Sequence, residues 1–207
     1  AGELDPEEEK FWAEESEADI GIFLVNALDD WNSSVDKDTS SGTITVLLTK
    51  VFASTTSTQE HGDAFSEKLL NAHDRIVRGT LKKFNGREVK HTGSGIMVTF
   101  QQATQGVESA IDIMHGLTNH NTTAPDLPLH LQIGINTSEH VKENDHSFGT
   151  TVQLAMSVCD FAGKDQIVVS KLVQDLCAGR DLKFNNLGKL ESEAFAENIP
   201  IFRVLWK

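Results

Sequence analysis

From residue 42 onward, apolar and polar positions follow the periods of strands and helices. The β-branched run TITVLLTKVF after Gly42 is typical of a buried strand, and apolar positions at helical spacing predict a helix over about 59–84. FNGREVKHTGSGIMVTF predicts a hairpin around Gly93 and Gly95. The remaining patterns predict a helix over 103–118, a strand in LPLHLQIGIN, a helix over 151–163, a strand in QIVVS, a short helix over 171–178 and a strand in IPIFRVLW.

The order strand, helix, strand, strand, helix, strand is that of a ferredoxin-like α+β sandwich, here with C-terminal additions. This order serves many unrelated activities, so it predicts an architecture and leaves the function open. The expected domain covers residues 42–207.

Residues 1–41 have a different, acidic and helical character. Asp5 as N-cap and Pro6 at the first helical position, followed by three glutamates, predict the start of a helix. Polar residues 32–42 predict a linker. Two arrangements stay open, because the helix either pairs with a dimer mate or partner domain, or folds back onto its own domain's sheet. The apolar stripe that would make this contact consists of Ile20, Phe23, Leu24, Ala27, Leu28 and Trp31.

The net charge of −13 is concentrated at the N-terminal end. Residues 1–40 hold 13 acidic and two basic side chains, whereas residues 41–207 hold 18 acidic and 16 basic ones. The sequence shows no basic stripe, so nucleic acid is not an expected partner. No apolar run approaches the ~18 residues of a membrane span, and the N-terminus lacks a signal-peptide pattern. Cys159 and Cys177, without CxxC spacing, are expected to be buried reduced thiols of a cytoplasmic domain.

Five local sequences are more specific than the order of elements. They are TVLLTKVFAST, FNGREVKHTGSGIMVTF, LQIGINTSEHV, FGTTVQLAMSVCDFAGKDQIVVS and NLGKLESEAFAENIPIFRVL. In this order and spacing they resemble the catalytic domain of class III adenylate and guanylate cyclases, over about residues 43–206. The resemblance implies a dimer with active sites at its interface, where two aspartates hold two divalent metals on a nucleoside triphosphate.

The resemblance places the two metal aspartates at Lys50 and Ser94. Neither side chain binds Mg²⁺ as a carboxylate does, because Mg²⁺ prefers hard anionic oxygen ligands, and Lys50 repels the ion. The metals supply most of the catalysis in such chemistry. No metal cofactor is therefore expected, and Mg²⁺ or Mn²⁺ enters only if the chain is an active cyclase.

Other positions that the resemblance marks are also substituted. The transition-state asparagine and arginine fall at Gln153 and Ser157, and the lysine that grips the terminal phosphates falls at Glu193. The base-reading lysine is retained as Lys90, and its polar companion falls at His146. The positions left to contact a nucleotide are Lys90, His146, Lys50 and Glu193.

These substitutions predict a catalytically inactive cyclase-homology domain, a pseudo-cyclase, that acts in dimerisation or regulatory signalling. It would form a homodimer, or a heterodimer with another cyclase-type domain, with a possible ligand in the degenerate cleft. Two alternatives stay open. One is a divergent cyclase that converts ATP or GTP, alone or with an intact partner subunit, and the other is a nucleotide-sensing module without turnover.

Overall fold

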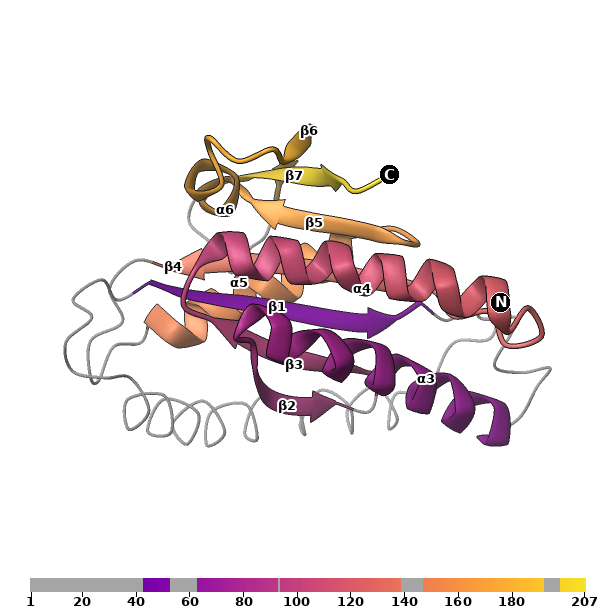
Figure 1. Ribbon diagram of the computed structural model, residues 1–207. Helices are drawn as coiled ribbons and strands as arrows, with labels where there is room; N and C mark the ends of the chain where they lie inside the picture. The colour runs from indigo at the N-terminus through magenta and orange to yellow at the C-terminus, as the bar shows by residue number, and fades with distance from the viewer. Residues whose placement is uncertain (1–42, 53–62, 93, 139–146, 192–197) are drawn as a thin grey trace, which may run out of the picture.

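The computed structural model describes residues 43–52, 63–92, 94–138, 147–191 and 198–207. These residues form one seven-stranded sheet with helices on both faces (Figure 1). The first six main elements follow the order βαββαβ, which confirms the ferredoxin-like α+β fold class. In chain order the elements are β1 (Ile44–Val51), α3 (Asp63–Leu81), the 3₁₀ turn η1 (Lys82–Phe84), β2 (Arg87–Thr92), β3 (Gly95–Phe100), α4 (Ala103–Thr123), β4 (Leu131–Ser138), α5 (Ser147–Phe161), β5 (Gln166–Ser170), α6 (Lys171–Leu176), β6 (Lys183–Leu190) and β7 (Ile199–Leu205).

The strands lie in the order β2-β3-β1-β4-β5-β7-β6. β1 runs antiparallel to both neighbours, with Leu48 opposite Met97 of β3 and Gly134 of β4. β4 and β5 form a parallel pair. Their carboxyl-terminal residues, Ser138 and Ser170, therefore lie at the same end of the parallel pair.

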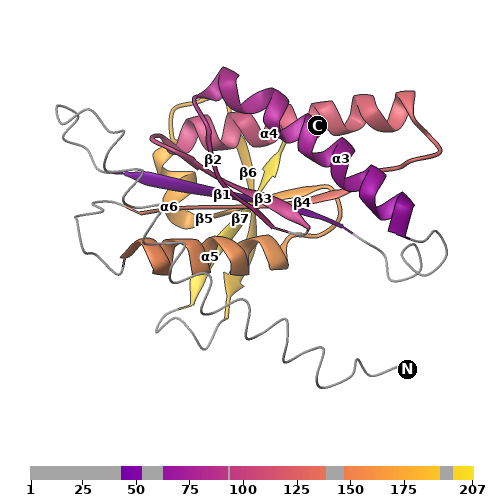
Figure 2. The ribbon, with the colours of Figure 1, turned by 90° about the horizontal axis from the view of Figure 1, so that it is seen from below.

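Helices cover the two faces of the sheet unequally. α3 and α4 lie on one face and α5 lies on the other (Figure 2). Successive side chains of a strand point to opposite faces, so β1 serves both layers. Leu47 packs in the core under α3 and α4, whereas Val46 packs with Val152 of α5. The same alternation places Lys50, at the end of β1, on the α5 side.

α5 approaches β4 without an intervening side chain. A Cβ on Gly134 would lie 2.3 Å from the backbone nitrogen of Cys159, so this contact requires glycine. The Cys159 thiol lies 3.6 Å from the carbonyl oxygen of Leu48. Burial raises the pKa of Cys159 to about 12 and that of Cys177 to about 11. Both cysteines are buried and free, as the sequence predicted.

The boundaries of several helices differ from those predicted, and α5 begins at Ser147, four residues earlier than expected. α3 ends at Leu81, and the chain then tightens into η1 before Asn85 ends it in the left-handed conformation, with φ at 54°. α4 continues past residue 118 to Thr123. Thr122 and Thr123 each donate to the carbonyl four residues earlier. Residues 59–62 of the first predicted helix lie outside the described residues.

The sequence prediction missed β6. Its sequence KFNNLGKL is mostly polar and exposed, and its pairing with β7 is interrupted by a bulge near Gly188, where φ is +97°. β6 lies at an edge of the sheet. An edge strand is ordered by hydrogen bonds to its one neighbour, so it needs no regular apolar alternation that a sequence would reveal.

The acidic helix and linker predicted for residues 1–41 lie outside the described residues, so both arrangements proposed for them stay predictions. Among the helices in the described part of the chain, none combines the length and apolar character needed to cross a membrane.

Candidate functional site

The end of β1 and the turn between β2 and β3 bring Lys50 and Ser94 together. The N–H of Val51 donates to the carbonyl oxygen of Ser94 at 2.8 Å. Gly95 lies directly against β1, since a Cβ there would be 1.7 Å from the carbonyl oxygen of Thr49. The approach therefore requires glycine. Lys50 and Ser94 are far apart in the sequence but lie next to each other where β1 ends and β3 begins.

Lys50 forms an ion pair with Asp160 of α5. Its Nζ lies 2.9 Å from Oδ1 of Asp160, and the two side chains are 48% and 60% exposed. An ion pair with this exposure contributes only ~0–1 kcal/mol to stability. Its main effect is on position, because it holds the ammonium of Lys50 against the one carboxylate that α5 presents here. Asp160 was not among the site residues predicted from the sequence.

Gln153, Ser157 and Asp160 share one side of α5, because they are spaced four and three residues apart. The hydroxyl of Ser157 donates to the carbonyl oxygen of Gln153 at 3.1 Å, which engages it with the helix backbone. Gln153 is exposed and carries no charge. Helical spacing from Gln153 and Ser157 is the sequence pattern that would have identified Asp160. The surface formed by Lys50, Ser94, Gln153, Ser157 and Asp160 is called the β1–α5 surface below.

Lys90 lies farther along the same face of the sheet. It is partly buried and opposite Met97 of β3, beside a bulge that follows Glu88. Directly opposed residues of antiparallel strands point to the same face, and Met97 packs on the α5 side. β3 therefore separates Lys90 from β1. His146 and Glu193, the other two nucleotide-pocket candidates, lie outside the described residues.

A buried chain of hydrogen bonds lies beneath the end of β1. Oγ1 of Thr49 is 2.8 Å from Nε2 of His73, and Nδ1 of His73 is 2.9 Å from Oδ1 of Asp74. The N–H of Ile96 donates to Oγ1 of Thr49 at 3.0 Å. A neutral imidazole suits this arrangement, because Nδ1–H donates to Asp74 and leaves Nε2 as an acceptor toward the hydroxyl of Thr49, which also lies 3.3 Å from the carbonyl oxygen of Ile96.

This order of hydroxyl, imidazole and carboxylate is also that of a hydrolytic triad. His73 is fully buried and Thr49 is 4% exposed, so no substrate reaches the hydroxyl. The arrangement is therefore structural. Burial lowers the pKa of His73, which favours the neutral imidazole that the hydrogen bonds require.

Asp74 extends this series of hydrogen bonds to the protein surface. Its carboxylate lies 3.0 Å from Nε2 of His91 and 3.2 Å from Nη1 of Arg78. Arg78 donates twice to Glu88 of β2, at 2.7 and 2.8 Å. Although burial alone would raise the pKa of Asp74, the hydrogen bond from His73 and the charge of His91 lower it overall. The hydrogen bonds from Arg78 lower the pKa of Glu88. We call the set Thr49, His73, Asp74, Arg78, Glu88 and His91 the His73 network.

The β1–α5 surface does not fit a site for Mg²⁺ or Mn²⁺. Both ions require several oxygen ligands, and anionic ones are preferred. Lys50 is cationic, Ser94 is neutral, and Asp160 is already engaged by Lys50. In the residues that the structure describes, no group of three or more His, Cys, Asp or Glu side chains is arranged to hold a metal ion.

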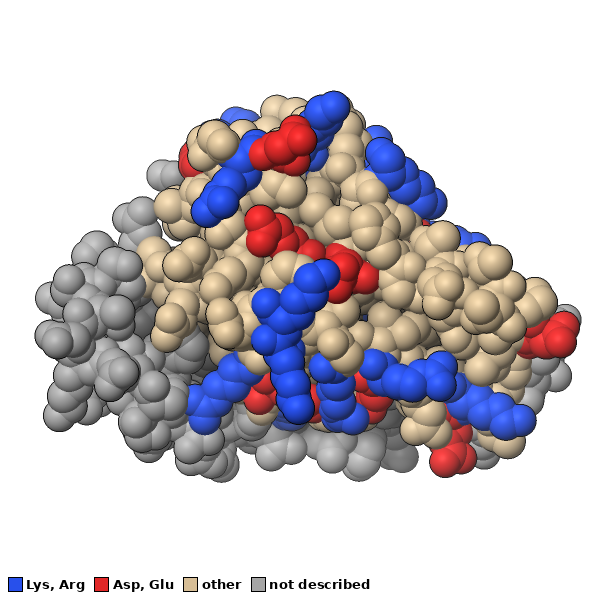
Figure 3. Space-filling model, in the orientation of Figure 1, with Lys and Arg blue, Asp and Glu red and all other residues tan. Residues whose placement is uncertain are grey.

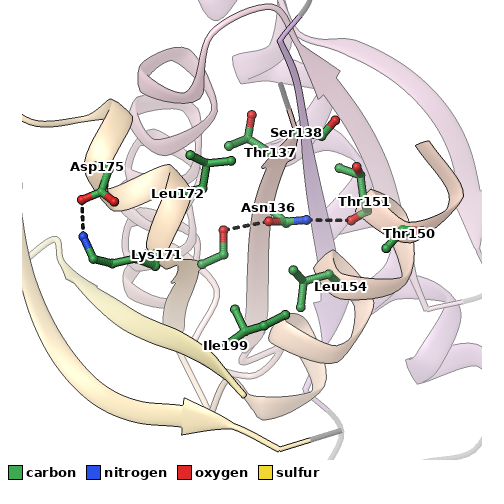
Figure 4. A pocket seen from close by; sticks show the side chains of 11 residues that line it. Asn136, Thr137, Ser138, Thr150, Thr151, Leu154, Lys171, Leu172, Asp175 and Ile199 are labelled. Atoms are coloured by element: carbon green, nitrogen blue, oxygen red, sulfur yellow. Dashed lines mark hydrogen bonds and ion pairs between the residues drawn. The ribbon is translucent and has the colours of Figure 1, made fainter. Parts of the chain in front are cut away.

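An open pocket of about 690 Å³ lies where β4 and β5 end (Figure 4). Asn136 lies at its centre. Its Nδ2 donates to the carbonyl oxygen of Thr151 at 3.1 Å, and its Oδ1 accepts from the hydroxyl of Ser170 at 2.7 Å. One amide thus joins β4, α5 and β5. The apolar lining comes from Leu154, Leu172 and Ile199.

Asn136→Ala is expected to lower the free energy of unfolding by ~1–3 kcal/mol, because it leaves the hydroxyl of Ser170 and the carbonyl of Thr151 without their partner. Urea unfolding measures this change. Gln153→Ala on the exposed side of α5 is the control and should change stability by less than ~0.5 kcal/mol. Equal effects of the two substitutions would contradict the structural role given to Asn136.

A family model matches nearly the whole chain. The model described as "Adenylate and Guanylate cyclase catalytic domain" matches residues 11–202. Among curated proteins, the serine/threonine-protein kinase pkn2 of Myxococcus xanthus is 26% identical over 176 residues, covering 84% of this chain and 19% of that protein. The putative adenylate cyclase 3 of Rhizobium meliloti is 29% identical over 119 residues, covering 56% of this chain and 20% of that protein. The chain thus spans about one fifth of the length of these relatives.

Solved structures show the same fold. The non-canonical dimeric guanylyl cyclase domain of the RhoGC fusion protein from Blastocladiella emersonii superposes with a TM-score of 0.65. The alignment covers 79% of this chain and 96% of that one, at 15% sequence identity. At this identity the likeness concerns the fold alone.

Proposed function

Because this chain belongs to the adenylate and guanylate cyclase catalytic domain family, we propose that it is a catalytically inactive member that acts in dimerisation or regulatory signalling. The ion pair between Lys50 and Asp160 is the observation that carries this proposal. It puts an ammonium where the family resemblance expects a metal-binding carboxylate. It also occupies the carboxylate of α5 that lies nearest to this position.

Cyclisation of a nucleoside triphosphate requires deprotonation of the ribose 3′-hydroxyl, its attack on the α-phosphorus and departure of pyrophosphate. In such chemistry divalent metals lower the pKa of the hydroxyl and neutralise the phosphate charge. The side chains of Lys50 and Ser94 offer no carboxylate to hold those metals. No catalytic step through a metal is therefore assigned to this chain.

The transition-state positions support the same proposal. Gln153 is neutral, and the hydroxyl of Ser157 is engaged by the backbone of α5. Removing one donor to a developing anion typically costs ~3–4 kcal/mol, or about 10²–10³ in rate. Losses within one site are not additive, but here the metal positions and the transition-state positions are substituted together.

A regulatory role through association is supported by the exposed side of α5. Met156 and Phe161 are 37% and 47% exposed and flank the β1–α5 surface. Large apolar side chains beside a polar surface favour contact with a partner protein. We infer that this partner is a second cyclase-type domain, in a homodimer or a heterodimer. The similar domain from Blastocladiella emersonii, which is described as dimeric, agrees with this inference.

Met156→Asp is expected to weaken this association at least tenfold, since it puts a charge into an apolar contact. Analytical ultracentrifugation over a range of protein concentrations measures the dissociation constant. Leu205→Asp, on a similarly exposed apolar residue at the end of β7, is the matched control and should leave association unchanged. An unchanged constant for Met156→Asp would place the interface elsewhere.

The lack of catalysis is tested by incubating the purified chain with ATP or GTP and with Mg²⁺ or Mn²⁺. Mass spectrometry should detect no cyclic nucleotide, while an active cyclase domain in the same buffer serves as the positive control. A second incubation adds this chain to the active domain. Product from the chain alone would overturn the proposal, and a mixture more active than the partner alone would favour the alternative of a cyclase that requires an intact subunit.

A further inference from the structure

A row of cations follows the exposed side of α3 and η1. Lys68, Arg75 and Lys82 are spaced seven residues apart, which is close to two helical turns, so they follow one another along the helix. All three are exposed. Within the described ranges, none of them makes a hydrogen bond or an ion pair. We call these three residues the basic row.

The wider surroundings of the basic row are also positive. Residues 63–90 hold seven basic and four acidic side chains. Lys and Arg side chains gather along the lower edge of the face in Figure 3, where Figure 1 places α3. The composition of residues 41–207 is nearly neutral, so the sequence predicted no basic stripe. Folding nevertheless gathers these cations on one helix.

The acidic segment of the chain joins the domain close to this row. Thr43, the first described residue, donates its hydroxyl to the carbonyl oxygen of Gln101 at 3.0 Å. Gly86, just after η1, lies against the ring of Phe100, since a Cβ there would be 2.7 Å from it. The start of β1 and the end of η1, where Lys82 lies, therefore meet at the same end of β3.

The segment is also long enough to reach the whole row. The row spans roughly 21 Å along the helix axis, at about 1.5 Å per residue. The linker 32–42 can extend to about 35 Å, and residues 5–31 as a helix would span roughly 40 Å. The linker is therefore long enough for the acidic residues to reach the basic row of the same molecule.

We propose that the acidic residues 7–19 dock on the basic row of their own chain. The sequence EEEKFWAEESEAD opposes seven carboxylates to one lysine, and the row offers three cations that have no partner among the described residues. A groove of about 520 Å³ between α3 and α4 borders Arg75, but its lining is mostly polar and includes Asp112, so the docking is assigned to the charges of the basic row and not to this groove.

This docking differs from both arrangements left open by the sequence. The contact is with the segment's own domain, but through α3 and not through the sheet. The apolar stripe of residues 20–31 then lies outside the contact and stays available to a partner. The docking thus leaves the proposed pseudo-cyclase function unchanged and adds an electrostatic control on the segment that precedes the domain.

The test uses the full chain with Ser16→Cys carrying a nitroxide spin label. The native Cys159 and Cys177 are buried with raised pKa values, so the label attaches to the introduced thiol. Amide peak intensities in ¹⁵N-labelled protein are compared with the label oxidised and reduced. We expect loss of the α3 peaks around the basic row at ~0.1 M salt, and their recovery at ~1 M salt, where the Debye length falls to about 3 Å.

Two charge-reversal variants make the test specific. K68E/R75E/K82E should restore the α3 peaks, whereas K164E/K183E/K189E, with the same change in net charge on another exposed region, should not. Unchanged α3 peaks in the parent protein, or a loss that the first variant keeps, would overturn the proposal. A loss seen only between spin-labelled and ¹⁵N-labelled chains in a mixture would also overturn it, because the contact would then be with a dimer mate.

Discussion

Lys50→Asp is expected to make the protein respond to Mn²⁺. Without metal, the substitution removes the ion pair and leaves two carboxylates facing each other, so the melting temperature falls. Mn²⁺ then binds between the new carboxylate and Asp160, and bound metal stabilises the folded state. At a concentration 100 times the dissociation constant the gain is about 2.7 kcal/mol. For a domain of this size that is roughly 5–10 °C in melting temperature.

Thermal unfolding with and without Mn²⁺ measures this response, and two variants control it. Lys50→Ala removes the ammonium without adding a ligand, so its melting temperature should not depend on Mn²⁺. Adding Asp160→Asn to Lys50→Asp removes the second carboxylate and should abolish most of the gain. If the unaltered protein or Lys50→Ala gained as much as Lys50→Asp, the position of Lys50 would not explain the absence of a metal site.

His73→Ala is expected to cause the largest loss of stability among single substitutions near the site. It opens a cavity in a fully buried position and removes the partner of both Thr49 and Asp74. Cavity formation and unsatisfied polar groups together cost ~2–5 kcal/mol. Urea unfolding measures the change, and His115→Ala on the exposed side of α4 is the matched control. A loss below ~1 kcal/mol for His73→Ala would contradict the role of the network.

The His73 network also predicts how stability depends on pH. Burial lowers the pKa of His73 below its ordinary 6.5, so below pH 6.5 the unfolded chain binds a proton that the folded protein excludes. The free energy of unfolding therefore falls as the pH drops below 6.5. Asp74 and Glu88 have lowered pKa values, so they stabilise the fold when ionised. Their contribution is lost at more acid pH, below their ordinary values of 3.8 and 4.5.

His73→Gln separates the two effects, because glutamine fills similar space and does not titrate. Urea unfolding of this variant should show a smaller dependence on pH between 6.5 and 5, while the decline below pH 4.5 remains. His115→Gln should behave as the unaltered protein does. An unchanged slope between pH 6.5 and 5 in His73→Gln would assign that dependence to another group.

The sequence predicted the parts of this structure that follow from repeating patterns. The buried strand β1, the helices and the hairpin follow from apolar spacing, and the small residues around Ser94 marked the tight turn that reaches β1. By contrast, the contact between Lys50 and Asp160 depends on which turn of α5 lies over the end of β1. That depends on the close approach at Gly134, which no local pattern reveals.

The His73 network could not be predicted from the sequence for a related reason. A histidine and an aspartate next to each other on a helix point to different sides, and nothing local shows that the first meets Thr49 on a distant strand. The same holds for Asn136, whose amide joins three elements. β6 was not predicted because an exposed edge strand has no regular alternation of apolar residues. Contacts between distant segments decide the His73 network and the position of Asn136, and local composition does not reveal them.

We propose that this chain lacks the metal-dependent nucleotide chemistry of its family. Calorimetric titration of the purified protein with ATP and GTP, with and without Mn²⁺, tests it most directly. Mn²⁺ is expected to add nothing to nucleotide binding, and any binding without metal is expected to weaken in Lys90→Ala. Binding of either nucleotide that appears only with Mn²⁺ would overturn the proposal, because it would require metal ligands where Lys50 and Ser94 lie.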